Sequence, residues 1–194
     1  MAMWRDAARI ALYVFMLALV AEPVYARHHR PAEQAAPAQA VHVNTNVIVA
    51  FSPNGDATSV IVHAIDAARH EILVQAYGFT SKPILAALAG AEARGVTVKV
   101  ILDKSNETAR YSGATYVANH GIPVWIDGSV HIAHNKVMVF DEHSVLTGSF
   151  NFTNSAQRSN AENVVLFEDA PQLARLYVAD WNWRRRFSEP YHRR

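Results

Sequence analysis

Short apolar runs with strand character alternate with amphipathic segments of helical period along most of this chain. Residues 71–77 contain the run Ile72-Leu73-Val74, and residues 81–94 follow with Ser81 as a cap, Pro83 in the first turn and a stop at Gly95. Further strands are expected at 46–51, 96–102, 122–126, 137–140, 144–147 and 164–167, and further helices at 57–70, 108–119 and 171–187. This alternation predicts an α/β protein with an α/β/α sandwich. Because 137–140 and 144–147 are too close for a helical crossover, the sheet should be a mixed β-sheet.

Length and composition fit one globular domain. The chain has 194 residues, of which 51% are hydrophobic and 18% charged, and it contains no cysteine. Catalysis by cysteine and zinc binding by cysteine are therefore excluded, and the fold must be held by its core rather than by disulfides. The catalytic domain is expected to span residues 44–194, without an internal repeat.

The first residues have the pattern of a secretory signal. Arg5 and Arg9 precede an apolar run at 10–21, and Val24-Tyr25-Ala26 offers a cleavage site after Ala26. A membrane anchor is the alternative, but this run is shorter than the ~20 residues that span a bilayer. We expect a signal peptide at 1–26, a flexible tether at 27–43 and export to the periplasm or beyond, without a stable membrane anchor.

One segment concentrates the chemically useful side chains. His134-Asn135-Lys136 is followed by Asp141 and then by Gly148-Ser149-Phe150-Asn151, which gives the pattern H-x-K-x4-D-x6-G-S-x-N. Alternation along a strand should bring His134 and Lys136 to one face, and the next strand should bring Ser149 and Asn151 to the same end.

This pattern resembles the signature of the phospholipase D superfamily. Phe51-Ser52-Pro53, the run from Gln75 to Thr80, and Asn160-Ala161-Glu162-Asn163 resemble the small, single-motif bacterial periplasmic endonuclease branch, over roughly Val43 to the C-terminus. The resemblance implies a phosphodiesterase with a phospholipase D/nuclease-like fold. It also implies a homodimer that builds one active site from two chains, and that Glu162 orients the histidine ring.

Residue chemistry assigns roles within such a site. A neutral His134 can attack phosphorus to form a covalent phosphohistidine, while a second, protonated histidine donates to the leaving oxygen. Lys136 and Asn151 can stabilise the non-bridging oxygens, and Ser149 adds a hydroxyl donor. In-line transfer places attacker and leaving group on opposite sides of phosphorus, so a chain with one motif should pair with a second copy. We expect Asp141, at the hairpin turn, to fix loop geometry.

A metal is not expected. His131 precedes His134 by three positions, which is compatible with zinc, but the sequence supports no third ligand and Lys136 already supplies positive charge. We therefore predict an enzyme that needs neither a metal nor another cofactor.

The motif fixes the reaction but leaves the substrate open. Nucleic acid, DNA or possibly RNA, is favoured by the small size, the endonuclease-like segments and the cations near the C-terminus. Those cations can equally be the solvated face of a terminal helix. Four residues are expected to line the rim of the cleft and bind phosphate: Lys82, Lys104, Asn106 and Arg110. The alternatives are a phospholipase D that acts on lipid headgroups, and a DNA-binding module without activity.

Overall fold

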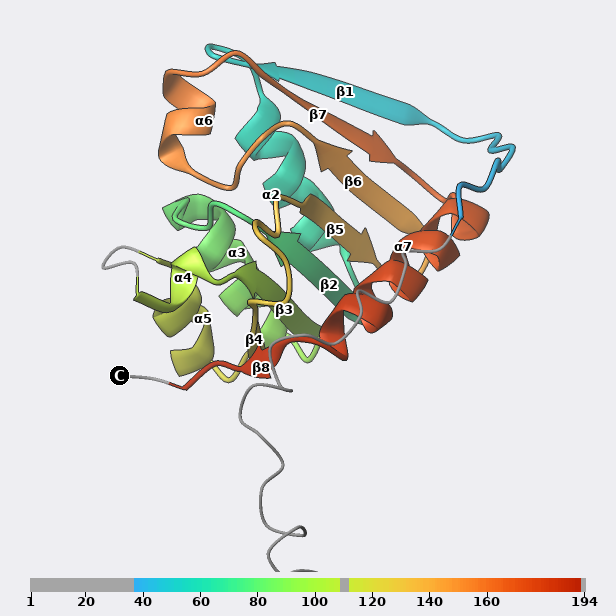
Figure 1. Ribbon diagram of the computed structural model, residues 1–194. Helices are drawn as coiled ribbons and strands as arrows, with labels where there is room; N and C mark the ends of the chain where they lie inside the picture. The colour runs from blue at the N-terminus through green and yellow to red at the C-terminus, as the bar shows by residue number, and fades with distance from the viewer. Residues whose placement is uncertain (1–36, 109–111, 193–194) are drawn as a thin grey trace, which may run out of the picture. The chain divides into compact units, whose positions relative to one another are not determined.

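Strands from the whole domain assemble into one mixed sheet (Figure 1). The computed structural model describes residues 37–108 and 112–192, and the domain described below begins at Ala38. The strands are β1 (Val47–Ser52), β2 (Glu71–Ala76), β3 (Thr97–Asp103), β4 (Val124–Asp127), β5 (Lys136–Phe140), β6 (Ser144–Gly148), β7 (Glu162–Phe167) and β8 (Glu189–Pro190). Their order in the sheet is β1-β7-β6-β5-β2-β3-β4-β8.

The direction of the strands decides where the motif residues meet. Strands β2, β3 and β4 are parallel, whereas β5 runs antiparallel to β2 with Lys136 opposite Ala76. Strands β5, β6, β7 and β1 are then antiparallel in succession. The ends of β2, β3, β4, β6 and β1 therefore lie at the same edge as the starts of β5 and β7. We call this edge the site end of the sheet.

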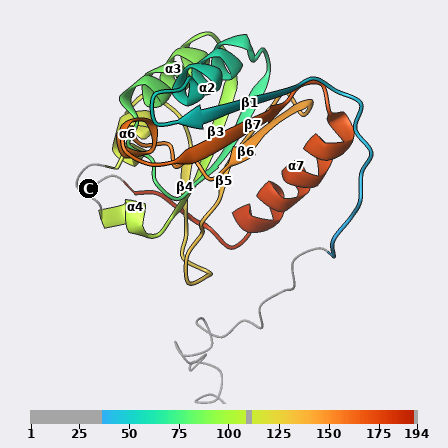
Figure 2. The ribbon, with the colours of Figure 1, turned by 90° about the horizontal axis from the view of Figure 1, so that it is seen from above.

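Helices cover both faces of the sheet, as Figure 2 shows with α2 and α3 on one side and α7 on the other. The helices are α2 (Ala57–Ala67), α3 (Lys82–Ala93), α4 (Ser105–Thr108), α5 (Ala114–Asn119), α6 (Asn154–Arg158) and α7 (Pro171–Arg185). The expected α/β/α sandwich with a mixed sheet is confirmed. In the described residues no helix is both long enough and apolar enough to cross a membrane.

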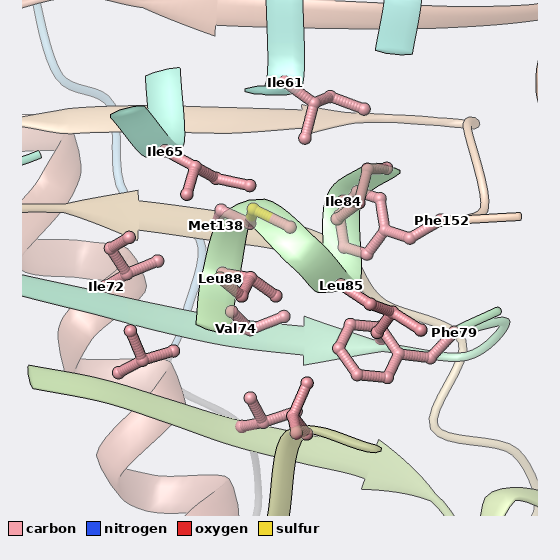
Figure 3. Packing of buried hydrophobic residues seen from close by; sticks show 14 of the residues in the cluster. Ile61, Ile65, Ile72, Val74, Phe79, Ile84, Leu85, Leu88, Met138 and Phe152 are labelled. Carbon is pink, nitrogen blue, oxygen red and sulfur yellow. The ribbon is translucent and has the colours of Figure 1, made fainter. Parts of the chain in front are cut away.

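Period-two alternation divides the sheet residues between two apolar clusters. On β2, Ile72 and Val74 belong to the larger cluster under α2 and α3, whereas Leu73 belongs to the smaller cluster under α7. Figure 3 shows the larger cluster, in which Ile61 of α2 and Leu88 of α3 pack towards the strands. Both faces of β2 are buried, which is typical of a central strand covered by helices on both sides.

Some element boundaries differ from the sequence-based expectation. The helix expected at 57–70 ends at Ala67, because Ala68 is extended and the next three backbone N–H groups, of residues 69–71, donate to Asp141. The helix expected at 108–119 begins only at Ala114, after the separate helix α4. The caps also differ, since the side chain of Ser81 makes no capping hydrogen bond to α3. Helix α6 and strand β8 were not expected.

Candidate active site

His134 and Lys136 meet at the site end of the sheet. Lys136 begins β5 and is buried, with 6% of its surface exposed, whereas His134 lies just before the strand and is exposed. The ammonium of Lys136 donates to the carbonyl oxygen of His134 at 2.7 Å. Burial lowers the pKa of Lys136 below its ordinary value, and the negative charge of Glu162 raises it in part. The exposed imidazole of His134 thus lies next to the buried, hydrogen-bonded ammonium of Lys136.

Asn151 is held at the same end by its two neighbours. Phe150 and Phe152 are each 1% exposed, and this alternation turns the side chain between them away from the core. The side-chain oxygen of Asn151 accepts from the backbone N–H of Gly78 at 3.4 Å. A Cβ at Gly78 would lie 2.8 Å from Thr153 and 3.2 Å from Asn151. Only glycine therefore allows the loop after β2 to come this close to the two residues.

Ser149 joins the end of β6 to the start of β7. Its hydroxyl oxygen accepts from the backbone N–H of Asn163 at 3.1 Å. The preceding Gly148 has a φ of 150°, and a Cβ there would lie 2.3 Å from the carbonyl oxygen of Asn163. Gly148 therefore permits the close approach of the paired strands β6 and β7 at this end, and Ser149 remains exposed.

Glu162 begins β7 and lies at the site end of the sheet. Its carboxylate accepts from Asn160 at 3.0 Å, and its charge acts on Lys136. The ring of His134 lies against the ring of Tyr77. Orientation of the histidine by Glu162 remains a prediction from the family resemblance.

Sequence and structure comparisons agree on the family. The domain described as "Cardiolipin synthase, PLD-like domain" matches residues 61–183. A protein named phospholipase D from Rickettsia prowazekii is 43% identical over 148 residues, which cover 76% of this chain and 72% of that protein. The chain belongs to the phospholipase D superfamily.

Two further likenesses place this phospholipase D superfamily member among its relatives. Nuc of Salmonella typhimurium, a phospholipase D family member of known structure, is 39% identical with a TM-score of 0.74, covering 77% of this chain and 100% of that one. Human mitochondrial cardiolipin hydrolase is 30% identical over 130 residues, or 66% of this chain and 51% of that protein. The chain is thus similar to phosphodiesterases, and the assignment to this superfamily is confirmed.

Asp141 lies at the opposite end of β5 from the other motif residues. The five residues of the strand place it about 15 Å from Lys136. Its carboxylate accepts from the backbone N–H groups of Arg69, His70 and Glu71 at 2.7 to 2.9 Å. Burial acts to raise the pKa of Asp141, but these three donors outweigh it and lower the pKa. In this phospholipase D superfamily chain, Asp141 anchors the start of β2 and is remote from the other motif residues.

Of the four residues expected at the rim, three lie in the described part of the chain. Lys82 begins α3 and is exposed, and Lys104 is exposed while its ammonium donates to the carbonyl oxygen of Val130 at 3.1 Å. Asn106 differs from the expectation, because it is 5% exposed and donates to the carbonyl oxygen of Tyr77 at 2.7 Å. Asn106 is therefore a structural residue and does not line the rim. Arg110 lies outside the described residues.

Asp103, at the end of β3, supports the motif but was not singled out from the sequence. It is 2% exposed, and one of its oxygens accepts from the N–H of Ala133 at 2.8 Å, next to His134. The other oxygen accepts from Ser105 at 2.9 Å. Burial acts to raise the pKa of Asp103, but these hydrogen bonds and the charge of Lys104 lower it. A polar residue at the end of a parallel strand was the available signal.

Residues 37–108 and 112–192 contain no group of three or more His, Cys, Asp or Glu side chains arranged to hold a metal. The expected independence from metals remains a prediction.

Proposed function

We propose that this phosphodiesterase is a non-specific, metal-independent endonuclease, in which two chains share one active site. The observation that carries the proposal is the meeting of His134, Lys136 and Asn151 at one end of the sheet. An accessible nucleophile lies there beside a buried cation and an amide. These are the groups that hydrolysis of an anionic diester requires.

The reaction has two steps. In the first, His134 of one chain attacks phosphorus, a nitrogen–phosphorus bond forms, and the oxygen–phosphorus bond to the leaving group breaks. His134 of the second chain gives that oxygen its proton. In the second step the same second histidine takes a proton from water, and the hydroxide forms an oxygen–phosphorus bond. The nitrogen–phosphorus bond breaks, the phosphate product leaves, and both imidazoles return to their initial states. Lys136 and Asn151 stabilise the charge that develops on the non-bridging oxygens.

An exposed apolar strand at the edge of the sheet supports the second chain as partner. Strand β1 is an edge of the sheet, and Val47, Val49 and Phe51 on it are 48%, 50% and 63% exposed. An apolar stripe of this kind is typical of an association surface. The strand ends at Ser52, which is opposite Glu162 at the site end. The stripe therefore runs towards the same edge of the sheet at which His134 lies, and a twofold partner can associate there.

Nucleic acid is the substrate that we favour. Lys82 and Lys104 are exposed cations near the site end of the sheet, and they suit a polyanionic backbone. Binding to phosphates rather than bases gives cleavage with little sequence preference, and its rate should fall as salt is added. The endonuclease-like segments of the sequence support the same choice.

Phospholipid is the second candidate. Ile132 is 47% exposed and lies two residues before His134, so an apolar side chain is available beside the imidazole. The name phospholipase D, carried by the relatives from Rickettsia, favours it as well.

Incubation with two substrates distinguishes the candidates. Wild type and His134→Ala are incubated with supercoiled plasmid DNA and with phosphatidylcholine vesicles, each with and without excess chelator. We expect wild type to nick and linearise DNA equally well in chelator, and His134→Ala to be inactive. Release of choline without DNA cleavage selects the phospholipase. Activity on neither substrate selects the binding module, and activity that a metal restores after chelation contradicts the metal-free mechanism.

A mixing experiment tests the shared site. Wild type and His134→Ala are co-refolded in varied ratio at constant total protein. If both histidines are needed in one dimer, activity follows the square of the wild-type fraction and is about one quarter at equal amounts. A linear decrease means that each chain acts alone. Light scattering should give twice the monomer mass.

Export is part of the proposal. The signal expected at 1–26 lies outside the described residues. Mass spectrometry of protein recovered from the periplasm of an expressing bacterium should give a chain that begins at Arg27.

A further inference from the structure

The loop that follows β2 connects the two halves of the motif. The backbone N–H of Tyr77 donates to the carbonyl oxygen of Asn135 at 3.0 Å, and Gly78 donates to the side chain of Asn151. Farther along this loop, the N–H groups of Thr80 and Ser81 both donate to the carbonyl oxygen of Phe152 at 2.9 Å. Residues 77–81 thus touch the His-Lys segment with one part and the Ser-Asn segment with another.

Tyr77 also makes contact through its ring. The ring centroid of Tyr77 lies 4.8 Å from that of His134, with the two planes inclined at 53°. The ammonium of Lys136 lies 5.3 Å from the centroid of the same ring. A single aromatic side chain therefore contacts both the proposed nucleophile and the proposed cation.

An exposed imidazole needs such a contact. The terminal torsion of histidine, χ2, has broad minima, so an exposed ring is not held at one angle by its own rotamer preference. Attack on phosphorus requires one ring nitrogen to point along the axis of displacement. His134 is exposed, and the tilted ring of Tyr77 restricts the angles that its imidazole can adopt.

Tyr77 is itself fixed from below. Its carbonyl oxygen accepts from the buried side chain of Asn106 at 2.7 Å, and Asn106 in turn accepts from Ser112 at 3.0 Å. With its N–H bonded to Asn135, both backbone groups of Tyr77 are engaged. Hydrogen bonds to both backbone groups therefore hold Tyr77 directly after β2.

We propose that Tyr77 is a positioning residue that orients the imidazole of His134 for attack on phosphorus. The inference rests on the proposed role of His134 as nucleophile and adds a group to it. The ring is the part that acts, because both contacts are with its face or edge. The hydroxyl is not required.

A second Tyr–His pair in the same protein provides a matched control. Tyr116 of α5 and His120, which directly follows that helix, have ring centroids 4.4 Å apart at 38°, and both are exposed. Three variants are compared with wild type: Tyr77→Leu, Tyr77→Phe and Tyr116→Leu. The substrate is bis(p-nitrophenyl) phosphate, a small diester without bases or lipid, and the folded fraction is checked by thermal unfolding.

Loss of orientation should lower kcat rather than raise KM. We expect Tyr77→Leu to reduce kcat by about 10- to 100-fold, with KM changed by less than about twofold. Tyr77→Phe should restore most of the lost rate, and Tyr116→Leu should match wild type. In histidine-selective NMR spectra, Tyr77→Leu should shift the ring protons of His134 but not those of His120, and Tyr116→Leu should do the reverse.

Several results would overturn the inference. These are an unchanged kcat in Tyr77→Leu, a Tyr77→Phe variant as slow as Tyr77→Leu, or unmoved ring protons of His134. If Tyr77→Leu does not fold, wild type still decides, because a nuclear Overhauser effect between the two rings is expected and its absence contradicts the contact. If wild type cleaves no diester, the proposed function is refuted instead. The nuclear Overhauser effect then tests the ring contact on its own.

Discussion

The ammonium of Lys136 donates a 2.7 Å hydrogen bond to the carbonyl oxygen of His134, two residues earlier in the chain. The bond ties the cation of the motif to the backbone of His134, the proposed nucleophile. Lys136 is buried, with 6% of its surface exposed, and this burial lowers its pKa. A charge in this position disfavours the folded state, so its presence points to function rather than to stability.

Lys136→Met should therefore separate activity from stability. We expect kcat to fall by about 10²- to 10³-fold, because a donor to the developing charge is lost. The melting temperature should rise, since methionine fills similar space without a buried charge. Thermal unfolding followed by circular dichroism measures the second effect.

The pH dependence of this difference has a definite sign. The folded pKa of Lys136 lies below the ordinary value of 10.5, so the folded protein binds this proton less tightly than the unfolded chain does. The advantage of Lys136→Met is then full at pH values below the lowered pKa and closes as the pH rises through that pKa towards 10.5. Lys99→Met is the control, because Lys99 pairs with Glu71 at 2.7 Å and is partly exposed. That variant should keep its activity, and a Lys136→Met protein less stable than wild type would contradict the argument.

Gly78→Ala should damage the site without damaging the fold. The added methyl group would lie 2.8 Å from Thr153 and 3.2 Å from Asn151, so the amide of Asn151 must move. We expect at least about a tenfold loss of kcat, since sub-ångström placement of such donors governs their effect. Gly128→Ala is the matched control, because a Cβ there meets nothing within 4 Å. Equal activities of the two variants would show that this close approach is unimportant.

Asp141→Asn should destabilise the protein and leave the activity of the folded fraction unchanged. The amide keeps the shape and tolerates the φ of 53°, but it loses the charge that three N–H groups face. The free energy of unfolding should fall by about 1–3 kcal/mol, as measured in urea. A large loss of kcat in folded Asp141→Asn would instead give Asp141 a part in the chemistry.

Acid should reveal the same carboxylate. The folded pKa of Asp141 lies below its ordinary value of 3.8, so its contribution to stability is full above 3.8 and is lost as the pH falls through the lowered pKa. Urea unfolding below pH 4 should therefore show a smaller pH dependence in Asp141→Asn than in wild type. An identical acid dependence in both proteins would rule out this contribution.

Asp103→Asn makes the same exchange at the site end of the sheet and should give a different result. One carboxylate oxygen there accepts from the N–H of Ala133, and an amide NH₂ in its place would repel that group. Because Ala133 precedes His134, we expect both stability and kcat to decrease. If the activity of folded Asp103→Asn equals that of folded Asp141→Asn, the bond to Ala133 does not position His134.

The sequence predicted what depends on local pattern. Strands such as β2 and β5 follow from runs of apolar residues, and the meeting of Lys136 with Asn151 follows from the hairpin between them. The end of α2 could not be predicted, because it depends on Asp141, which is distant in sequence. Its carboxylate accepts hydrogen bonds from the N–H groups of residues 69–71, which would otherwise donate within a longer helix. The prediction for Asn106 was wrong for a related reason. Its position in the sequence does not show that its side chain donates to the carbonyl oxygen of Tyr77, 29 residues earlier.

The two ends of β5 differ in what they hold. Lys136 is its first residue, and the hairpin turn of Asp141 and Glu142 follows its last residue. Both turn residues have positive φ, of 53° and 58°, which a glycine at the second position accommodates with less strain. An engineer who wants a more durable protein can therefore work on the hairpin, for example with Glu142→Gly, without touching the groups proposed to bind phosphate. Durability and turnover are adjustable separately in this protein because one short strand keeps them apart.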